Sequence, residues 1–100
     1  MMKCNKKIVI HGNIRNESFM FSALQKAALY GLTGFIKSKS KGIIFIEAEG
    51  TAEQINLLIE WCRKGTVWSD VSDVQVVKGD VKNHKEFVIK KTSIFQVFAL

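Results

Sequence analysis

The sequence lacks several features that would assign it to a specialised class of protein. It contains no proline and only two cysteines, Cys4 and Cys62, whose spacing matches no metal site. Its apolar runs, such as GIIFI at residues 42–46, are far shorter than the ~20 residues that a helix needs to cross a bilayer. The amino-terminal segment MMKCNKKIVIHG has no apolar core typical of a signal peptide. We therefore expect a cytoplasmic protein with two free thiols, no metal, no cofactor and no contact with a membrane.

Length and charge indicate one small basic domain. Of the 100 residues, 47% are hydrophobic, which is enough for a single modest core. The formal net charge of +6 favours anionic partners without naming one, because the lysines are spread over short clusters typical of turns and solvated strand ends. We treat residues 1–100 as one domain, with a core at about residues 6–91 and an apolar carboxy-terminal extension at residues 92–100.

Hydrophobic spacing predicts the order strand, helix, strand, strand, helix and further strands. Alternation indicates strands, and recurrence every three or four residues indicates helices. These patterns give strands at 6–12, 33–38, 42–50, 72–82 and 85–91, and helices at 18–30 and from 51 to about 65. Thr51 and Gln54 have the spacing of a capping box at the start of the second helix. The order is typical of an α+β, ferredoxin-like βαββαβ sandwich, in which two helices pack on one face of an antiparallel sheet.

Two segments carry a resemblance to a known family. GNIRNESFM at residues 12–20 is similar to the motif Gly-x-Val-Gln-Gly-Val-Gly-Phe-Arg, and GFIKSKSKGII at residues 34–44 is similar to Gly-Trp-Val-x-Asn-x-x-Asp-Gly-x-Val. Both are motifs of the acylphosphatase family, which the chain resembles from about Lys6 to Lys91. The matching scaffold positions are Gly12, Ile14, Phe19, Gly31, Leu32, Thr33, Gly34, Phe35, Ile36, Gly42, Ile44, Gly50, Gly65, Val71 and Phe87.

The resemblance implies a specific chemistry for the two motifs. Acylphosphatases hydrolyse the carboxyl-phosphate bond of acyl phosphates. As the resemblance implies, backbone N–H groups of the first motif and its arginine hold the phosphoryl group, while the asparagine of the second motif holds the attacking water. Such a site works by positioning and electrostatics rather than by covalent catalysis.

This sequence departs from the family at the functional positions. Met20 stands at the arginine position and Ser38 at the asparagine position. The candidate anion-binding loop is otherwise made of Arg15, Asn16, Glu17, Ser18 and Phe19, of which only Phe19 matches the motif. Losing one transition-state donor typically costs ~100- to 1,000-fold in rate, and methionine has no donor to offer. We therefore expect a catalytically silent acylphosphatase-like domain that keeps the scaffold and binds a small anion, phosphate or an acyl phosphate, weakly at this loop.

Two other functions stay open on the sequence. Arg15 could swing towards the anion, which would give an active acylphosphatase with a rearranged site. The third reading is a ferredoxin-like nucleic-acid-binding module, because KGIIFIEA at residues 41–48 is similar to an RNA-binding strand motif. Base stacking needs aromatic side chains on the exposed sheet face, and only Phe45 qualifies. We therefore expect no nucleic-acid partner.

The face of the sheet opposite the helices is a candidate contact surface. Strand parity predicts that Val9, Ile43 and Phe45 share this open face. Residues 93–100 are apolar on both sides of an extended chain, so we expect this tail, or a second copy of the chain in a homodimer, to cover the face. His11 and His84 have no acidic partner apparent in the sequence, and we expect both at the surface.

Overall fold

The computed structural model describes residues 2–91. They form, in order, β1 (Cys4–Asn13), α1 (Asn16–Leu29), β2 (Thr33–Ser40), β3 (Ile43–Gly50), α2 (Ala52–Lys64), β4 (Asp70–Gly79) and β5 (Phe87–Lys90). The first helix starts at Asn16, two residues before the predicted start at Ser18. The predicted extension at residues 92–100 lies outside the described residues, so its packing stays a prediction. Within residues 2–91 we find no helix with the length and apolar character of a membrane span.

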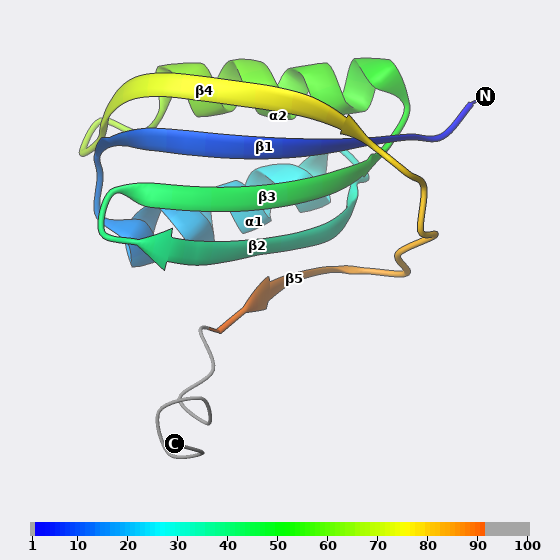
Figure 1. The fold of residues 1–100 in the computed structure, drawn as a ribbon, viewed down its shortest axis with the longest axis horizontal. Helices are drawn as coiled ribbons and strands as arrows, with labels where there is room; N and C mark the ends of the chain where they lie inside the picture. The colour runs from blue at the N-terminus through cyan, green and yellow to red at the C-terminus, as the bar shows by residue number, and fades with distance from the viewer. Residues whose placement is uncertain (1, 92–100) are drawn as a thin grey trace.

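The predicted ferredoxin-like α+β fold is confirmed, with one refinement in the direction of the last strand. The sheet has five strands in the order β4-β1-β3-β2-β5 (Figure 1). Strand β1 pairs antiparallel with β3 and β4, and β2 pairs antiparallel with β3, but β5 runs parallel to β2. The prediction of an antiparallel sheet did not include this pair. Strand β4 finishes at the end of the sheet where β2 begins, so the chain crosses to the far edge and continues in the direction of β2.

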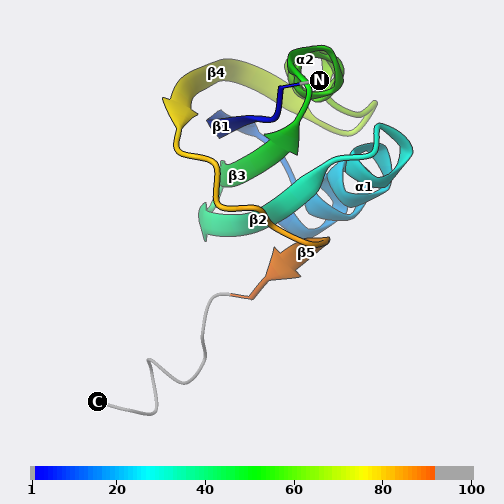
Figure 2. The same cartoon turned by 90° about the vertical axis from the view of Figure 1, so that its right-hand side faces the viewer.

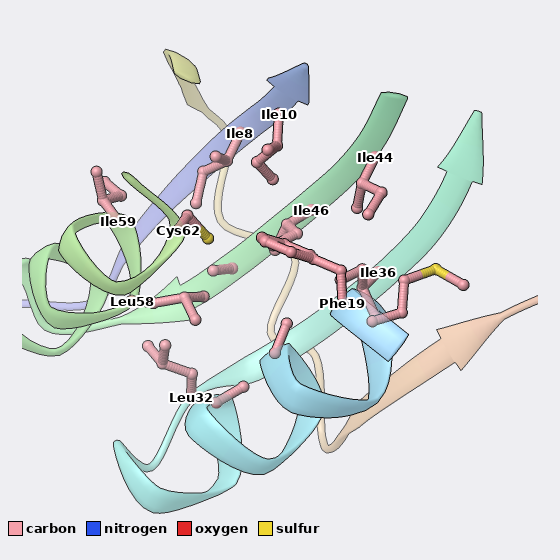
Figure 3. Packing of buried hydrophobic residues seen from close by; sticks show 14 of the residues in the cluster. Ile8, Ile10, Phe19, Leu32, Ile36, Ile44, Ile46, Leu58, Ile59 and Cys62 are labelled. Carbon is pink, nitrogen blue, oxygen red and sulfur yellow. The ribbon is translucent and has the colours of Figure 1, made fainter. Parts of the chain in front are cut away.

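Both helices pack on one face of the sheet and enclose the core (Figure 2). The predicted parity of β3 is confirmed, because Ile44, Ile46 and Ala48 are fully buried beneath the helices. The predicted capping box also forms: the Gln54 backbone N–H donates to Thr51 Oγ1, and the Gln54 side chain accepts from the Thr51 N–H. Figure 3 shows the resulting cluster, in which the labelled side chains are Ile8, Ile10, Phe19, Leu32, Ile36, Ile44, Ile46, Leu58, Ile59 and Cys62.

The open face carries a buried pair of carboxylates that the sequence analysis did not identify. Residues 80–86, which link β4 to β5, cross this face (Figure 2). Lys82 and His84 of this link contact Glu47 and Glu49, which are each only 1% exposed. Glu47 accepts hydrogen bonds from Lys82 Nζ at 3.0 Å and from His84 Nε2 at 2.6 Å. Glu49 accepts one from Asn5 Nδ2 at 2.8 Å and others from the backbone of the link. A buried acid is stable only when it is paired in this way.

The sequence showed no acidic partner for His84, but a distant strand contributes one, and the His84 side chain is 23% exposed. His11 is also near an acid, with Nδ1 3.9 Å from the Asp73 carboxylate across the β1–β4 pair. Neither contact is visible in the sequence, because it depends on which strands become neighbours. Burial alone would raise the pKa of the Glu47 carboxyl, but the hydrogen bonds from His84, Lys82 and Asn5 outweigh it and hold the pKa below its usual value.

Candidate functional site

The two motif segments meet through their glycines. The Gly12 N–H, at the end of β1, donates a 3.0 Å hydrogen bond to the Gly42 carbonyl in the β2–β3 turn. Gly42 has φ +77°, and a Cβ at this position would lie 2.6 Å from the Gly12 carbonyl oxygen. A side chain here would be both strained and in collision with backbone. The glycines of the two motifs therefore fix the loop before α1 against the hairpin, and they position everything else in the site.

The Asn16 side chain fastens the first turn of α1 to the same hairpin. Its Nδ2 donates to Ser38 Oγ at 2.6 Å and to the Ser40 carbonyl at 2.7 Å, and its Oδ1 accepts from the Gly42 N–H at 3.1 Å. An asparagine amide carries both a donor and an acceptor, so it can make all three bonds at once. The sequence indicated only that this residue replaces a loop glycine. The structure adds that its amide fills space next to the hairpin that a glycine would leave empty.

A pocket of about 440 Å³ lies at this junction, and its lining residues are Asn16, Glu17, Met20, Phe21, Ser38, Ile89, Lys90 and Lys91. It brings together the predicted site residues of both motifs. Met20 is 8% exposed and belongs to the apolar part of the pocket with Phe21 and Ile89. Lys91, directly after β5, brings positive charge to the site that was not expected from the sequence, whereas the Lys90 ammonium lies over the Phe35 ring, 3.9 Å from its centroid. The only sequence signal was the lysine pair that ends the last predicted strand.

The predicted anion-binding loop is divided by the fold into separate environments. Arg15 is the N-cap residue of α1 and lines a different pocket of about 380 Å³ with Ser18 and Trp68. Phe19 is 1% exposed and packs against Trp61 in the core, with ring centroids 5.0 Å apart. Its backbone N–H already donates to the Arg15 carbonyl at 2.9 Å. Phe19 is therefore part of the helix and the core, and it has no donor to offer to an anion.

The electrostatics of the site favour anions but give no fixed clamp for a phosphoryl group. The N-cap residue Arg15 makes no side-chain hydrogen bond to the first turn of α1, and the N–H groups of such a turn lack intrahelical acceptors. Glu17 adds a negative charge in this turn, where it complements the helix dipole and repels an incoming anion. The cations that line the pocket, Lys90 and Lys91, are flexible point charges rather than a planar two-pronged donor. Within residues 2–91 no cluster of histidine, cysteine and acidic side chains suits a metal ion.

Comparisons of the sequence with known proteins agree on one family. The model of the family described as Acylphosphatase matches residues 6–89. An acylphosphatase of Anaeromyxobacter sp. strain Fw109-5 is 32% identical over 72 residues, which are 72% of this chain and 77% of the relative. One from Acaryochloris marina strain MBIC 11017 is 31% identical over 83 residues, or 83% and 89% of the two chains. The structure of an acylphosphatase from Coxiella burnetii has a TM-score of 0.83 and 26% identity, covering 88% of this chain and 93% of its own.

Proposed function

The chain belongs to the acylphosphatase family, and we propose that it is a catalytically silent member that binds a small anion at the family's site. The observation that carries the proposal is Met20, an apolar side chain 8% exposed at the position of the motif's arginine. A thioether cannot neutralise the charge that develops on a phosphoryl group. Each such donor typically contributes ~100- to 1,000-fold to the rate of an enzyme.

The hydrogen bonds of Asn16 support the same proposal. Family members have a glycine at this position, where the bare backbone can approach a phosphoryl group. In this chain the amide occupies that side of the loop and is engaged by Ser38, Ser40 and Gly42. Ser38, at the position of the water-holding asparagine, accepts from this amide. Two positions that would act on substrate in the family are thus bonded to each other.

Weak binding of an anion is consistent with the charge that lines the pocket. Lys91, directly after β5, brings positive charge to the pocket, and the first turn of α1 adds the positive end of its helix dipole. Glu17 opposes both. The pocket also has an apolar part around Met20, Phe21 and Ile89, which suits an anion with an apolar substituent, such as an acyl or aryl phosphate. We also propose a cytoplasmic location, in keeping with Cys4 and Cys62, which are both free thiols.

The alternative is an active acylphosphatase that uses Arg15 in place of the missing arginine. Its support comes from the relatives, which are named acylphosphatases, and from the exposure of Arg15 at the start of α1. Against it, Arg15 lines the pocket with Trp68 and not the one with Met20 and Ser38.

Hydrolysis of benzoyl phosphate by the purified full-length chain tests both readings. We expect no acceleration over buffer with an unrelated protein, while an acylphosphatase with the family's arginine and asparagine serves as the positive control. A turnover number above ~1 per second, the low end of ordinary enzymes, contradicts the proposal. Any activity found should then be measured in Arg15→Ala and in the matched control Arg63→Ala, which removes an exposed arginine from α2. Loss of activity only in Arg15→Ala would establish the rearranged site.

A further inference from the structure

Two phenylalanine rings lie side by side on the open face of the sheet. Phe35 of β2 and Phe45 of β3 have ring centroids 5.8 Å apart at an interplanar angle of 39°. Both side chains are half-buried, and their strands are paired neighbours. From the sequence alone, only Phe45 was expected as an aromatic on this face. The register of β2 against β3 places the Phe35 ring next to that of Phe45, so the face carries a pair of aromatic rings.

Three lysines from two strands gather over these rings. Lys90 Nζ lies 3.9 Å from the centroid of Phe35, while Lys37 Nζ and Lys39 Nζ lie 5.5 Å and 5.8 Å from that of Phe45. Lys90 reaches the rings from β5 because β5 runs parallel to β2 and pairs it with Lys37. We call the surface formed by Phe35, Lys37, Lys39, Phe45 and Lys90 the aromatic–lysine face.

The charge of this face is not balanced by nearby acids. Within residues 2–91, none of its three lysines forms an ion pair with a carboxylate. Of the acids on the same side of the sheet, Glu47 and Glu49 are buried and already accept hydrogen bonds from Lys82, His84 and Asn5, and Asp73 of β4 lies next to His11. The face therefore combines flat apolar rings with free positive charge, on a chain whose formal net charge is +6.

We propose that the aromatic–lysine face binds single-stranded nucleic acid. Bases of a single strand can stack on the phenyl rings, while the lysines turn from the rings to the phosphates. In a duplex the bases are stacked on one another inside the helix, so they cannot stack on the phenyl rings. The proposal is independent of the function proposed above, since the face shares only Lys90 with the pocket around Met20.

The same observations disfavour an apolar occupant. Covering the rings with an apolar strand, either residues 92–100 or a second copy of the chain, would bury three ammonium groups or force them aside. Burial of an unpaired charge is costly, whereas contact with a polyanion satisfies it. The rings in turn distinguish a nucleic acid from polyanions that carry charge alone.

Fluorescence anisotropy of a labelled oligo-dT of about 12 nucleotides, titrated with the full-length chain, tests the proposal. We expect a dissociation constant of about 1 to 100 μM near physiological salt, weakening linearly in a log–log plot as salt is raised. The triple variant Lys37→Gln, Lys39→Gln, Lys90→Gln should lower that slope by about two, since each phosphate contact on a single strand contributes about 0.7. The matched control is the triple variant Lys26→Gln, Lys64→Gln, Lys78→Gln. It changes the net charge equally at residues outside the aromatic–lysine face, so its binding should stay close to that of the wild type.

The rings are tested separately from the charge. Phe45→Leu should weaken binding by about tenfold while leaving the salt slope unchanged, and Phe45→Tyr should retain it. Circular dichroism of each variant confirms that the fold is intact, and the tyrosine variant remains informative if the leucine variant unfolds. Four results overturn the proposal: no binding to the full-length chain, equal binding of a duplex of the same length, equal loss in the two lysine triples, or equal affinity of Phe45→Leu and the wild type. Polyphosphate of the same chain length that competes as well as unlabelled oligo-dT would show that binding depends on charge alone. This result would also overturn the proposal.

Discussion

The Asn16 amide donates a 2.6 Å hydrogen bond to the Ser38 hydroxyl, across 22 positions of sequence. By the resemblance of the two motifs, Asn16 stands at a loop glycine and Ser38 at the asparagine that would hold the water. The two positions are coupled in this chain, because the Asn16 amide donates to the Ser38 hydroxyl. The relationship favours a loop that is now stabilised as structure.

Asn16→Ala should consequently lower the stability of the domain. The substitution removes three hydrogen bonds to Ser38, Ser40 and Gly42, of which the last leaves a part-buried N–H without its acceptor. We expect a loss of about 1–2 kcal/mol in the free energy of unfolding, or roughly 4–16 °C in melting temperature for a domain of this size. Calorimetry measures it, with Asn56→Ala on the exposed side of α2 as the control. Equal melting temperatures for the two variants would show that the amide contacts do not stabilise the loop.

Restoring the family's site should require several substitutions at once. Met20→Arg alone places a guanidinium at a position 8% exposed and next to Glu17, so we expect it to reduce stability without creating useful phosphate binding. The five-fold variant with Glu17→Val, Asn16→Gly, Ser18→Gly and Ser38→Asn should bind phosphate about tenfold or more tightly than the wild type, the gain expected of one charge-assisted contact. Isothermal titration measures this, with Met20→Leu as the apolar control. Absence of a gain in the five-fold variant would indicate that the loop path itself differs from the family's.

The fold followed from the sequence where it depends on local pattern. The parity of Ile44, Ile46 and Ala48 and the capping box of Thr51 are set by residues a few positions apart, and both were predicted. The motifs indicated the candidate site only in outline. The positions of Met20 and Ser38 were found from the motifs, but the contact between Asn16 and Ser38 requires knowing how the hairpin meets the helix.

Two further differences have one physical cause, which is the path of the chain after β4. The crossing of residues 80–86 buries Glu47 under His84, and the parallel addition of β5 brings Lys90 to the open face. Both depend on which end of the sheet the chain leaves and on which edge it joins. The spacing of apolar residues contains neither piece of information. The strand at β5 could therefore be predicted from its sequence, but its pairing with β2 could not.

The buried carboxylates predict a loss of stability in acid. Burial would raise the pKa values of Glu47 and Glu49, but the hydrogen bonds from His84, Lys82 and Asn5 lower both overall. A carboxyl whose pKa is lower in the folded state stabilises the fold above its unfolded pKa of about 4.3, and this contribution is lost as pH falls through the folded value. We therefore expect urea unfolding to show stability falling from about pH 5 downwards.

Glu47→Gln identifies the contribution of one carboxyl. At neutral pH the variant should be less stable than the wild type by about 1–3 kcal/mol, because it loses two charge-assisted bonds to a side chain that is 1% exposed. The two proteins should converge as the pH is lowered, since the wild-type carboxyl is then protonated as well. Glu53→Gln, an exposed change on α2, should follow the wild type throughout. A difference between wild type and Glu47→Gln that stays constant with pH would refute the assignment.

The two thiols should differ sharply in reactivity. Cys62 lies on the core-facing side of α2 with no exposed surface, and burial raises the pKa of its thiol to about 12 (Figure 3). Reaction needs an accessible thiolate, so Cys62 can react only when the helix detaches or the domain unfolds. Cys4, in β1, is only half-buried.

In Cys4→Ser, where Cys62 is the single thiol, we expect disulfide-exchange labelling at least about a thousandfold slower in buffer than in denaturing urea, as the stability of a small domain implies. In Cys62→Ser, the remaining Cys4 should label much faster under the same native conditions. Rapid labelling of Cys62 in buffer would mean that α2 opens locally at low cost, and the core around Leu58 and Ile59 would then be less stable than its packing indicates.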